Sequence, residues 1–343
     1  MQFVLVTGGA GYIGSHTVTQ LLNDNYKVIV LDNFTNSSEI SLKRVADITN
    51  KEPIIIKGDV TDINIINSIF ENYNINSVVH FAGLKSVKES SVSPNLYYKN
   101  NIYGSVCLLE SMIRFGVNNL IFSSSATVYG EEANIPYIET MKLGTPSSPY
   151  GFSKLVVEKI ISDTVEANDN FQAINLRYFN PIGAHKSGKI GEDPSGTPNN
   201  LLPYISQVAI KKIERLNIYG NDYPTHDGTC RRDYLHVMDL ADGHIAALKY
   251  IQSKKDVGVE AFNLGTGNAY SVLEIVNKFK SVTDIDIPFK FSPRRDGDLS
   301  EFWADSNKAK EVLGWYCKRS LDEMIEDTWR WQLKNPNGFK KND

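Results

Sequence analysis

Short apolar runs rich in β-branched residues alternate with longer segments of helical periodicity through the first half of the chain. The runs lie at residues 3–7, 27–32, 53–58, 77–82, 119–125 and 171–179. The longer segments lie at 12–24, 63–72, 101–116 and 150–168 and repeat apolar side chains at helical spacing. Buried strands that alternate with helices are typical of a parallel sheet covered on both faces. The first half is therefore predicted to be a doubly wound, Rossmann-type α/β sheet.

The pattern changes after about residue 180. Residues 180–200 are dense in Gly, Pro, Asn and Ser, which indicates loop structure. Helical periodicity returns at 201–214, 240–252, 271–282 and 321–333. The division predicted is a binding platform at 1–180 and a smaller α/β substrate-binding lobe at 181–343, with some crossing of the chain between them.

Composition narrows the class of protein. The chain has 343 residues, of which 41% are hydrophobic and 22% charged, as in ordinary globular proteins. A net charge of −4 argues against a nucleic-acid or anionic-membrane partner. Three scattered cysteines favour a reducing compartment, and neither a signal peptide nor an apolar stretch of about 20 residues is evident. We expect a cytoplasmic protein.

A glycine-rich segment, TGGAGYIG, joins the first predicted strand to the first predicted helix. Gly8, Gly11 and Gly14 have the spacing that lets a tight turn bring the backbone close to a pyrophosphate at a helix N-terminus. Asp32 ends the second predicted strand, at roughly the 20-residue offset of a carboxylate that binds an adenosine ribose. Such a carboxylate favours the free ribose hydroxyls of NAD and repels a 2′-phosphate. A dinucleotide site selective for NAD is predicted.

Two further strand ends adjoin this predicted site. Asp59 follows the third strand, where its carboxylate either reaches the adenine edge or is a solvated acid. Residues 80–83, HFAG, end the fourth strand and would place small side chains beside the pyrophosphate and ribose of the cofactor. Both positions agree with the rule that ligands of doubly wound sheets bind beyond the carboxyl ends of the strands.

Two tyrosine–lysine pairs are spaced by one helical turn, Tyr150 with Lys154 and Tyr250 with Lys254. The same rule favours the first pair, because the fifth strand ends in SSSATVYG and the next helix begins with Ser148 as N-cap followed by proline. The second pair lies late in a helix assigned to the second lobe, where a solvated surface position is expected. Only the first pair is therefore a catalytic candidate.

The chemistry predicted for this pair is proton transfer. The lysine ammonium, the helix N-terminus and a positive nicotinamide ring each favour the phenolate and are expected to lower the phenol's pKa from about 10. A serine hydroxyl from the end of the fifth strand can align a substrate alcohol. The residues indicate proton removal from a hydroxyl coupled to hydride transfer onto NAD.

No other catalytic set competes with this one. The six histidines include no H-E-x-x-H pattern. His236, Asp239 and His244 are not spaced to place three ligands on one face, so no metal site is predicted. Neither a G-x-S-x-G elbow nor a phosphate-binding P-loop occurs.

The glycine motif, Ser125 and the Tyr150–Lys154 pair together resemble the extended short-chain dehydrogenase/reductase superfamily. The resemblance becomes closer in segments spread along nearly the whole chain: HFAGLKSV, FSSSATVYG, RYFNPIGAH, GEDPSGTPNNL, GNDYPTHDGT, RRDYLHVMDLADGH and RRDGDL. These are similar to segments of the UDP-glucose 4-epimerases. The resemblance implies an NAD-binding Rossmann domain at 1–180 and a nucleotide-sugar-binding domain at 181–343.

The resemblance also implies the residues of the site. The catalytic residues would be Ser125, Tyr150 and Lys154, which would also contact cofactor. Further cofactor contacts would be Gly8, Gly11, Tyr12, Ile13, Gly14, Asp32, Asn33, Phe34, Thr35, Asn36, Ser37, Asp59, Val60, Phe81, Ala82, Gly83, Leu84, Lys85, Asn100 and Phe179. Besides Ser125 and Tyr150, the UDP-sugar contacts would be Asn180, Asn200, Leu201, Tyr219, Arg232, Arg295, Asp298 and Phe302.

The implied reaction is the reversible conversion of UDP-galactose and UDP-glucose through a transient 4-keto sugar, as in galactose metabolism. Tyr150 would take the proton of the sugar 4-hydroxyl, and the nucleotide would stay anchored while the keto sugar turns over. The bulky Phe302 resembles members restricted to non-acetylated sugars, so weak or no activity on UDP-N-acetylhexosamines is expected. Helices at 94–116 and 147–167 would form the face of a homodimer.

Two other interpretations stay open. A nucleotide-sugar 4,6-dehydratase or decarboxylase would share the superfamily, but the dehydratases that this chain resembles carry an acidic pair where it has Ala126 and Thr127. A non-catalytic NAD-sensing protein would also share the fold. Such a sensor would have no need of Ser125, Tyr150 and Lys154 in register. The product formed from UDP-galactose separates the three possibilities.

Overall fold

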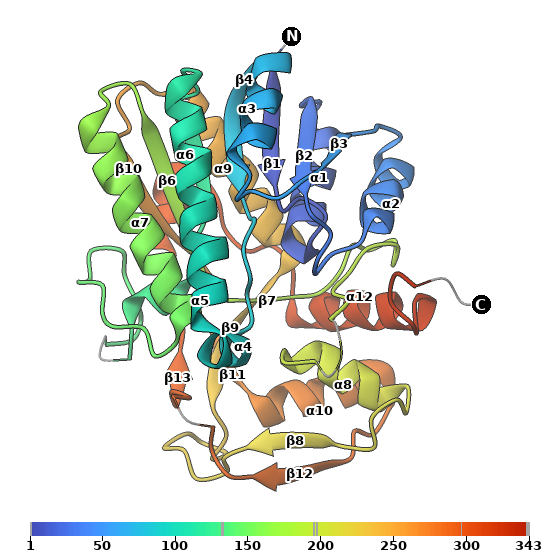
Figure 1. The fold of residues 1–343 in the computed structure, drawn as a ribbon. Helices are drawn as coiled ribbons and strands as arrows, with labels where there is room; N and C mark the ends of the chain where they lie inside the picture. The colour runs from blue at the N-terminus through green and yellow to red at the C-terminus, as the bar shows by residue number, and fades with distance from the viewer. Residues whose placement is uncertain (1, 132–133, 195, 197, 296, 341–343) are drawn as a thin grey trace.

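A parallel sheet of seven strands forms the larger part of the molecule (Figure 1). The computed structural model describes residues 2–340 except 132, 133, 195, 197 and 296. The strand order is β10-β6-β5-β4-β1-β2-β3. The strands are β1 (Phe3–Thr7), β2 (Val28–Asp32), β3 (Ile54–Lys57), β4 (Ile75–His80), β5 (Asn119–Ser123), β6 (Gln172–Tyr178) and β10 (Val259–Leu264). This confirms the predicted doubly wound α/β fold.

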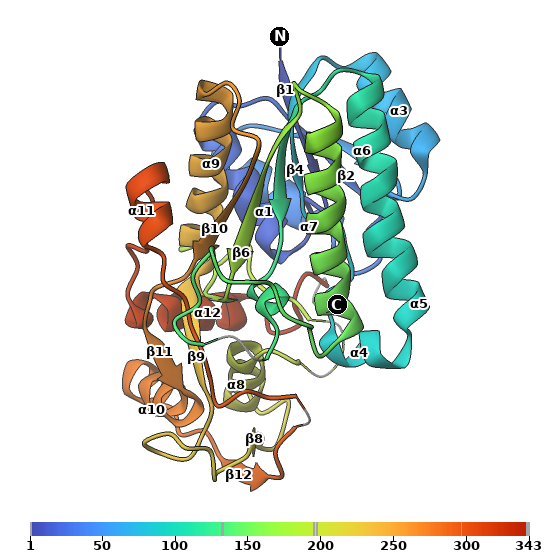
Figure 2. The ribbon, with the colours of Figure 1, turned by 90° about the vertical axis from the view of Figure 1, so that its left-hand side faces the viewer.

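Helices cover both faces of this sheet, as Figure 2 shows. Alternate residues of a strand point to opposite faces, so Val4 and Val6 join one apolar core while Leu5 joins the other. The first core is closed by α1 (Tyr12–Asn23), α2 (Glu39–Thr49) and α9 (Val237–Ser253). The second is closed by α3 (Ile63–Asn72), α6 (Gly104–Arg114) and α7 (Pro149–Ala167). Burial on both faces explains why the strands read as continuous apolar runs.

The second half of the chain contributes to both parts of the molecule. Strand β10 lies at the edge of the large sheet next to β6, and α9 packs against α1. The assignment of the 240–252 helix to the second lobe is therefore wrong. The expected solvated position of Tyr250 is also wrong, because its half-buried ring packs edge-on against Phe262 of β10. Lys254 is exposed at the end of α9, as expected.

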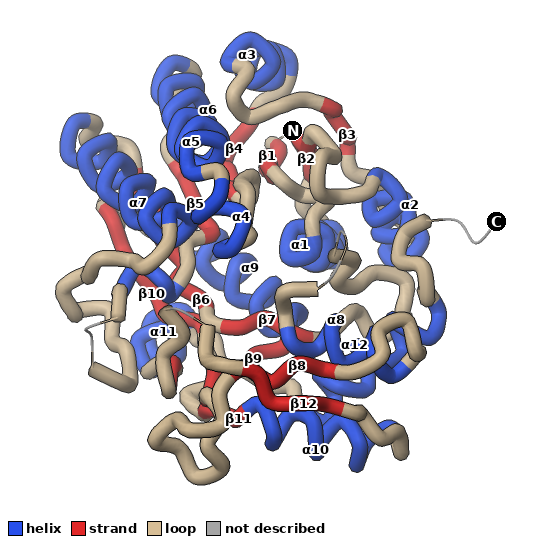
Figure 3. The backbone as a smooth tube through the Cα atoms, turned by 60° about the horizontal axis from the view of Figure 1, so that its bottom comes forward, coloured by secondary structure: helices blue, strands red, loops and turns tan. Residues whose placement is uncertain are grey.

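A smaller lobe lies beyond the carboxyl ends of the large sheet (Figures 1 and 3). It contains a sheet of β7 (Asn180–Ile182), β9 (Arg231–His236), β11 (Ala269–Ser271) and β13 (Glu301–Phe302), and a pair of β8 (Leu216–Tyr219) with β12 (Phe289–Ser292). Helices α8 (Leu201–Ala209), α10 (Val272–Thr283) and α12 (Leu321–Lys334) pack with these strands around a third apolar core. Helix α11 (Asn307–Leu313) lies beside β10.

Short helical elements occupy the connections near the carboxyl edge of the large sheet. They are α4 (Val87–Val92), α5 (Pro94–Tyr97), the π-helix η1 (Tyr98–Tyr103) and the 3₁₀ helix η2 (Ala126–Tyr129). The π-helix runs directly into α6, so the predicted helix at 101–116 is one continuous element with a wider first turn. Across the described part of the chain, every helix is too short or too polar to cross a membrane.

Strand β1, in the interior of the sheet, provides a test of the two-core arrangement. Leu5 is 0% exposed, and we expect Leu5→Ala to lower the free energy of unfolding by about 2–5 kcal/mol because the truncation leaves a cavity in the second core. The control is Leu333→Ala on α12, where the leucine is 57% exposed and a change within about 0.5 kcal/mol is expected. Urea denaturation followed by circular dichroism measures both, and equal losses would contradict the assignment.

Candidate active site

The turn after β1 is shaped by close approaches of the backbone. Gly8 has a φ of +70°, and a Cβ there would lie 2.7 Å from the Ala82 nitrogen. A Cβ on Gly14 would lie 2.3 Å from the Gly8 carbonyl oxygen. At Gly11, by contrast, a Cβ would meet only that same oxygen, at 3.4 Å. The space at Gly11 adjoins the first turn of α1, whose N–H groups have no partner within the helix, so the turn can accept a phosphate group.

Acidic side chains at the ends of β2 and β3 shape the neighbouring loops. Asp32 is buried, and its carboxylate accepts hydrogen bonds from the backbone N–H groups of Ala10 and Phe34, both at 2.9 Å. Asp59 accepts from the backbone and hydroxyl of Thr61 at 2.9 and 2.7 Å and from Asn33 at 2.8 Å. Burial raises the pKa of Asp59, but these hydrogen bonds outweigh it and leave the pKa lowered. Asp59 is therefore held in place at this edge by hydrogen bonds and is not a freely solvated acid.

The other expected cofactor residues surround this edge. Asn101 was not predicted, yet it fixes the loop after β4, because its side chain accepts from the Leu84 N–H at 2.8 Å and donates to the Leu84 carbonyl at 3.0 Å. Its predicted neighbour Asn100 is half-buried in η1. The remaining expected contacts lie at the turn and first residues of α1, in the β2–α2 loop, after β3 and β4, and after β6; they are Tyr12, Ile13, Thr35, Asn36, Ser37, Val60, Phe81, Gly83, Lys85 and Phe179.

The three predicted catalytic residues converge beyond β5. Ser125 follows the end of β5 and caps η2, where its oxygen accepts from the N–H and the hydroxyl of Thr127 at 3.2 and 3.0 Å. Helix α7 begins as predicted, with Ser148 as its N-cap and proline in its first turn. Tyr150 is half-buried in this first turn, and its phenol interacts with the Ser125 hydroxyl. Lys154 is buried one turn further on.

Burial controls the ionisation of these groups. It raises the pKa of the Tyr150 phenol, which the nearby phenol of Tyr178 reinforces and the Ser125 hydroxyl opposes. The expected lowering is thus wrong for the polypeptide by itself. Burial also lowers the pKa of Lys154 to about 8, against the opposing effect of the Glu158 carboxylate. Its ammonium group donates to the Ser123 carbonyl at 2.7 Å and lies 4.7 Å from the centre of the Phe122 ring.

Two arginines gather around one carboxylate in the smaller lobe. Asp298 lies 3.4 Å from Arg232 of β9 and 3.6 Å from Arg295. The Arg295 guanidinium stacks over the ring of Tyr219 at 4.2 Å. These four residues, which come from two separate stretches of the sequence, were all expected to contact the UDP-sugar. The structure brings them together, and the two guanidinium groups can neutralise a diphosphate.

Aromatic rings line the region between this cluster and the end of β6. Phe302 lies 5.0 Å from both Tyr137 and Phe179, measured between ring centres. Asn180 follows Phe179 and begins β7, where it is half-buried beside Tyr234 of β9. Phe302, expected to contact the UDP-sugar, thus lies next to Phe179 at the end of β6. Tyr137 was not predicted.

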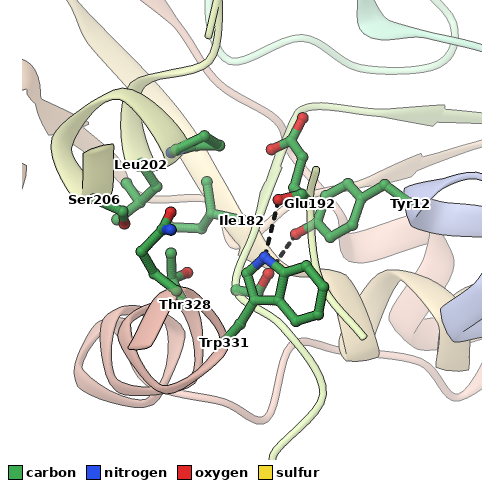
Figure 4. A pocket seen from close by; sticks show the side chains of 10 residues that line it. Tyr12, Ile182, Glu192, Leu202, Ser206, Thr328 and Trp331 are labelled. Carbon is green, nitrogen blue, oxygen red and sulfur yellow. Dashed lines mark hydrogen bonds between the residues drawn. The ribbon is translucent and has the colours of Figure 1, made fainter. Parts of the chain in front are cut away.

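A seam of polar contacts joins the two lobes near α8 (Figure 4). Glu192 accepts from the Asn200 side chain at 2.7 Å and forms an ion pair with Lys85 at 3.2 Å. Tyr12 donates to the Gly183 carbonyl at 2.6 Å. The cavity beside them has a volume of about 10 Å³, room for a single water molecule, so this seam is closely packed. Leu201 starts α8 next to it.

The other candidates from the sequence have structural roles. His236 caps α9 and faces Asp327 at 3.3 Å, while Asp239 forms an ion pair with Arg319. His244 bonds to a carbonyl of its own helix. The described residues contain no group of three or more His, Cys, Asp or Glu side chains arranged to hold a metal. Of the quoted motifs, Ser195, Thr197 and Asp296 lie outside the described residues.

Several residues around the predicted catalytic group escaped prediction, notably Glu158, Arg177 and Tyr178, and so did Glu192 in the seam near α8. Two carried a signal in the sequence. Glu158 follows Lys154 by a further helical turn, on the buried side of a helix, and Arg177 interrupts the apolar run of β6. A charged residue inside an apolar run indicates a buried partner of opposite charge, but it does not say which residue that partner is.

Comparison with known proteins agrees with this geometry. A model of the GDP-mannose 4,6 dehydratase family matches residues 5–328. UDP-glucose 4-epimerases of Erwinia amylovora and Bacillus subtilis are 53% and 51% identical over 335 and 337 residues, which cover 98% of this chain and 99% and 98% of theirs. The crystal structure of UDP-glucose 4-epimerase from Bifidobacterium longum in complex with NAD+ and UDP has a TM-score of 0.94 at 46% identity, covering 98% of this chain and 100% of that one. The chain therefore belongs to the UDP-glucose 4-epimerase family within the extended short-chain dehydrogenase/reductase superfamily.

Proposed function

We propose that this protein interconverts UDP-galactose and UDP-glucose with NAD as a bound cofactor. The observation that carries the proposal is the convergence of Ser125, Tyr150 and buried Lys154 beyond β5, on the sheet edge that also bears the glycine turn. The relatives named above are epimerases of this kind. The test is the formation of UDP-glucose from UDP-galactose by the purified chain, without added oxidant or reductant.

The residues present fit NAD. The open space at Gly11 and the first-turn amides of α1 can receive the pyrophosphate. The buried Asp32 lies at the end of β2, where a carboxylate suits the free hydroxyls of an adenosine ribose. When bound, NAD supplies the redox chemistry by accepting a hydride from C4 of the sugar and returning it, so the reaction passes through a 4-keto sugar. Residues 1–180, with β10 completing their sheet, would form the cofactor-binding part.

The polypeptide supplies the proton transfer. Tyr150 as phenolate takes the proton of the sugar 4-hydroxyl and later returns it, and the Ser125 hydroxyl aligns that oxygen. The Lys154 ammonium, with a pKa of about 8, carries its proton at neutral pH and stabilises the phenolate. Because burial raises the pKa of Tyr150, the phenolate depends on this lysine and on the positive charge of the bound cofactor.

The smaller lobe would hold the nucleotide. Arg232 and Arg295 can bind the diphosphate if their ion pairs with Asp298 break. The ring of Tyr219, beside Arg295, is available to contact the uracil. Phe302 bounds the space for the sugar, together with Phe179. A sugar held through its nucleotide can present either face of C4 to the cofactor.

The alternative activities have less support. A dehydratase needs an acid beside the catalytic hydroxyl to drive water loss. The side chain of Ala126 carries no acid, and the Thr127 hydroxyl already donates a hydrogen bond to Ser125. The nearby carboxylate of Glu158 is occupied by Arg177 and Ser124. Ser125, Tyr150 and Lys154 lie together at the starts of η2 and α7, and a protein that only senses NAD would not need this arrangement.

We also propose that the protein is a cytoplasmic homodimer. The three cysteines are free, which fits a reducing compartment. Large apolar side chains are exposed along α5, η1, α6 and α7, namely Leu96, Tyr103, Ile113 and Phe152. Helices α6 and α7 lie side by side on one face of the molecule (Figure 2). Two copies of this face would bury these side chains in a shared helical bundle.

The proposed role of Tyr150 can be tested by comparing it with Tyr250, the tyrosine of the second Tyr–Lys pair. Tyr150→Phe removes only the hydroxyl, and we expect kcat for UDP-galactose to fall by about 10²–10⁴-fold while the chain stays folded and retains NAD. Tyr250→Phe is the matched control, because that ring packs on Phe262 away from the site, and should leave kcat unchanged. A coupled assay for UDP-glucose measures both, and substantial activity in Tyr150→Phe would contradict the proposed base.

Substrate range should depend on Phe302. The wild-type protein should turn over UDP-N-acetylglucosamine weakly or not at all, because the phenylalanine fills space beside the sugar. Phe302→Cys should raise that activity by about tenfold or more, since it removes a bulky side chain. Phe291→Cys on β12, where the ring is exposed, should not. Comparable turnover of both sugars by the wild type would overturn this prediction.

If the protein dimerises through its exposed apolar face, a charge introduced on that face should dissociate the dimer. Leu96 is 50% exposed, and Leu96→Asp should shift the species seen by light scattering from dimer to monomer, because it buries an unpaired carboxylate in the interface. Leu333→Asp is the control for an exposed leucine elsewhere and should leave the mass unchanged. A monomeric wild type would refute the proposal.

A further inference from the structure

A buried ion pair lies directly behind the proposed catalytic residues. Glu158 of α7 is 5% exposed and Arg177 of β6 is 6% exposed. The guanidinium donates to both carboxylate oxygens, with an Nη2–Oε2 distance of 2.6 Å and Nε distances of 3.1 and 3.2 Å. The Ser124 hydroxyl donates to the same carboxylate at 2.5 Å. One side chain of α7 thus binds a residue of β6 and the residue that immediately precedes Ser125.

The pair is part of a longer buried chain of contacts. Arg177 donates to the Tyr129 hydroxyl at 3.3 Å, and that hydroxyl donates to the Asn263 side chain of β10 at 2.6 Å. The Tyr129 ring stacks on Tyr137, with ring centres 5.1 Å apart. Tyr137 in turn contacts Phe302. The carboxylate of Glu158 is therefore connected to the residues that border the proposed sugar space.

Two side chains of α7 hold consecutive residues of the strand end. Lys154 donates to the carbonyl of Ser123, and Glu158, one helical turn further along, accepts from the hydroxyl of Ser124. The next residue is Ser125. The position of that hydroxyl relative to the first turn of α7 is thus determined by two charged side chains of α7 itself.

We propose that Glu158 is a positioning residue for the epimerisation, which fixes α7 against residues 123–124 and supplies the negative charge that faces the Lys154 ammonium. The inference rests on the proposed function, because it assigns Glu158 a role in that reaction. Glu158 does not touch the substrate space in this arrangement; it acts through Ser124 and Lys154. Its side chain is the means by which the proton-transfer residues are held in register and the lysine kept charged.

The charges around Lys154 give Glu158 this second role. The other titratable groups near it are the phenols of Tyr150 and Tyr178, the imidazole of His80, and the guanidinium of Arg177 beyond Glu158. Burial, followed by the charge of Lys154, lowers the pKa of His80 to about 3, so that imidazole is neutral. Burial lowers the pKa of Lys154 and Glu158 raises it. Without that carboxylate the ammonium would lose its proton at a lower pH.

The decisive experiment is the pH profile of kcat for Glu158→Gln in the full-length, NAD-loaded protein. The amide keeps the size of the side chain and removes its charge. We expect kcat to fall by about tenfold or more, KM for UDP-galactose to stay within about twofold, and the alkaline limb of the profile to move by about one unit to lower pH. The sign follows because activity needs protonated Lys154, and its pKa falls when the neighbouring negative charge is removed.

Two controls separate this role from general effects of losing a carboxylate. Asp163→Asn lies on the same helix, where Asp163 pairs with Lys159 on the exposed face. Asp239→Asn removes a buried carboxylate that pairs with Arg319 far from the site. Both should retain the wild-type pH profile, the second even if it lowers the melting temperature. A folded Glu158→Gln variant with the wild-type profile would overturn the inference.

Further variants cover the case in which the single change prevents folding. Glu158→Gln with Arg177→Gln removes both charges of the pair, and a smaller shift of the alkaline limb to lower pH is expected, because the loss of the Arg177 charge partly compensates for the loss of the carboxylate. Ser124→Ala keeps both charges and loses only the contact to the strand end; kcat should fall by about threefold to tenfold without a shift in pH. Unchanged kinetics in both would refute the positioning role.

A readout independent of turnover separates this inference from the proposed function. Ultraviolet absorbance of the phenolate, taken as the difference from Tyr150→Phe, reports the titration of Tyr150 directly. With the Glu158 charge removed, the phenolate titration should move: to lower pH where the missing carboxylate acts directly on the phenol, and to higher pH where the earlier loss of the Lys154 proton dominates. If the wild type lacks epimerase activity, the proposed function fails while this titration still tests the coupling. If the wild type is active and the titration is unchanged, only the inference fails.

Discussion

All seven strands of the large sheet run in the same direction, and the rest of the structure depends on this alignment. Parallel strands must be joined by crossovers, so helices cover both faces and bury them in two apolar cores. The carboxyl edge is then the place where polar groups from distant parts of the chain meet. Gly8 follows β1, Asp32 ends β2, Ala82 follows β4, Ser125 follows β5 and Phe179 follows β6. The proposed cofactor and catalytic groups are neighbours because their strands are.

Charged groups are buried just below the carboxyl edge of the sheet, and their removal from water costs free energy. Removing an ion from water costs several kcal/mol even after relaxation, so a buried pair is a poor way to gain stability alone. Glu158 and Arg177 offset that cost with several hydrogen bonds to one carboxylate. Lys154 is buried nearby with a carbonyl partner and a lowered pKa. Charged groups that an apolar core would exclude are thus kept next to the proposed proton-transfer residues, and such buried charges are typical of catalytic sites.

The sequence predicted those parts of the molecule that depend on local order. The strands β1 to β6, the glycine turn and the start of α7 at Ser148 follow from periodicity and capping, which act over a few residues. The place of β10 in the large sheet did not follow, because its pairing with β6, far away in the sequence, leaves no local trace. The same limit applies to Tyr250, whose ring packs against β10, and to Glu158 of α7, whose partner lies on strand β6. The residues of the proposed UDP site came from resemblance, and only the fold shows that Arg232, Arg295 and Asp298 meet.

The two ends of the proposed substrate site differ in kind, and the difference suits the reaction. The end assigned to the nucleotide carries charges, with two guanidinium groups on one carboxylate. The end assigned to the sugar is bordered by the rings of Tyr137, Phe179 and Phe302. A ring face gives contact without a fixed direction, whereas a hydrogen bond to each hydroxyl would hold the sugar in one orientation. A keto sugar that must present both faces of C4 needs a strong anchor at one end and few directional contacts at the other. In the proposed mechanism Ser125 and Tyr150 would stay in place while either face of C4 is presented for reduction.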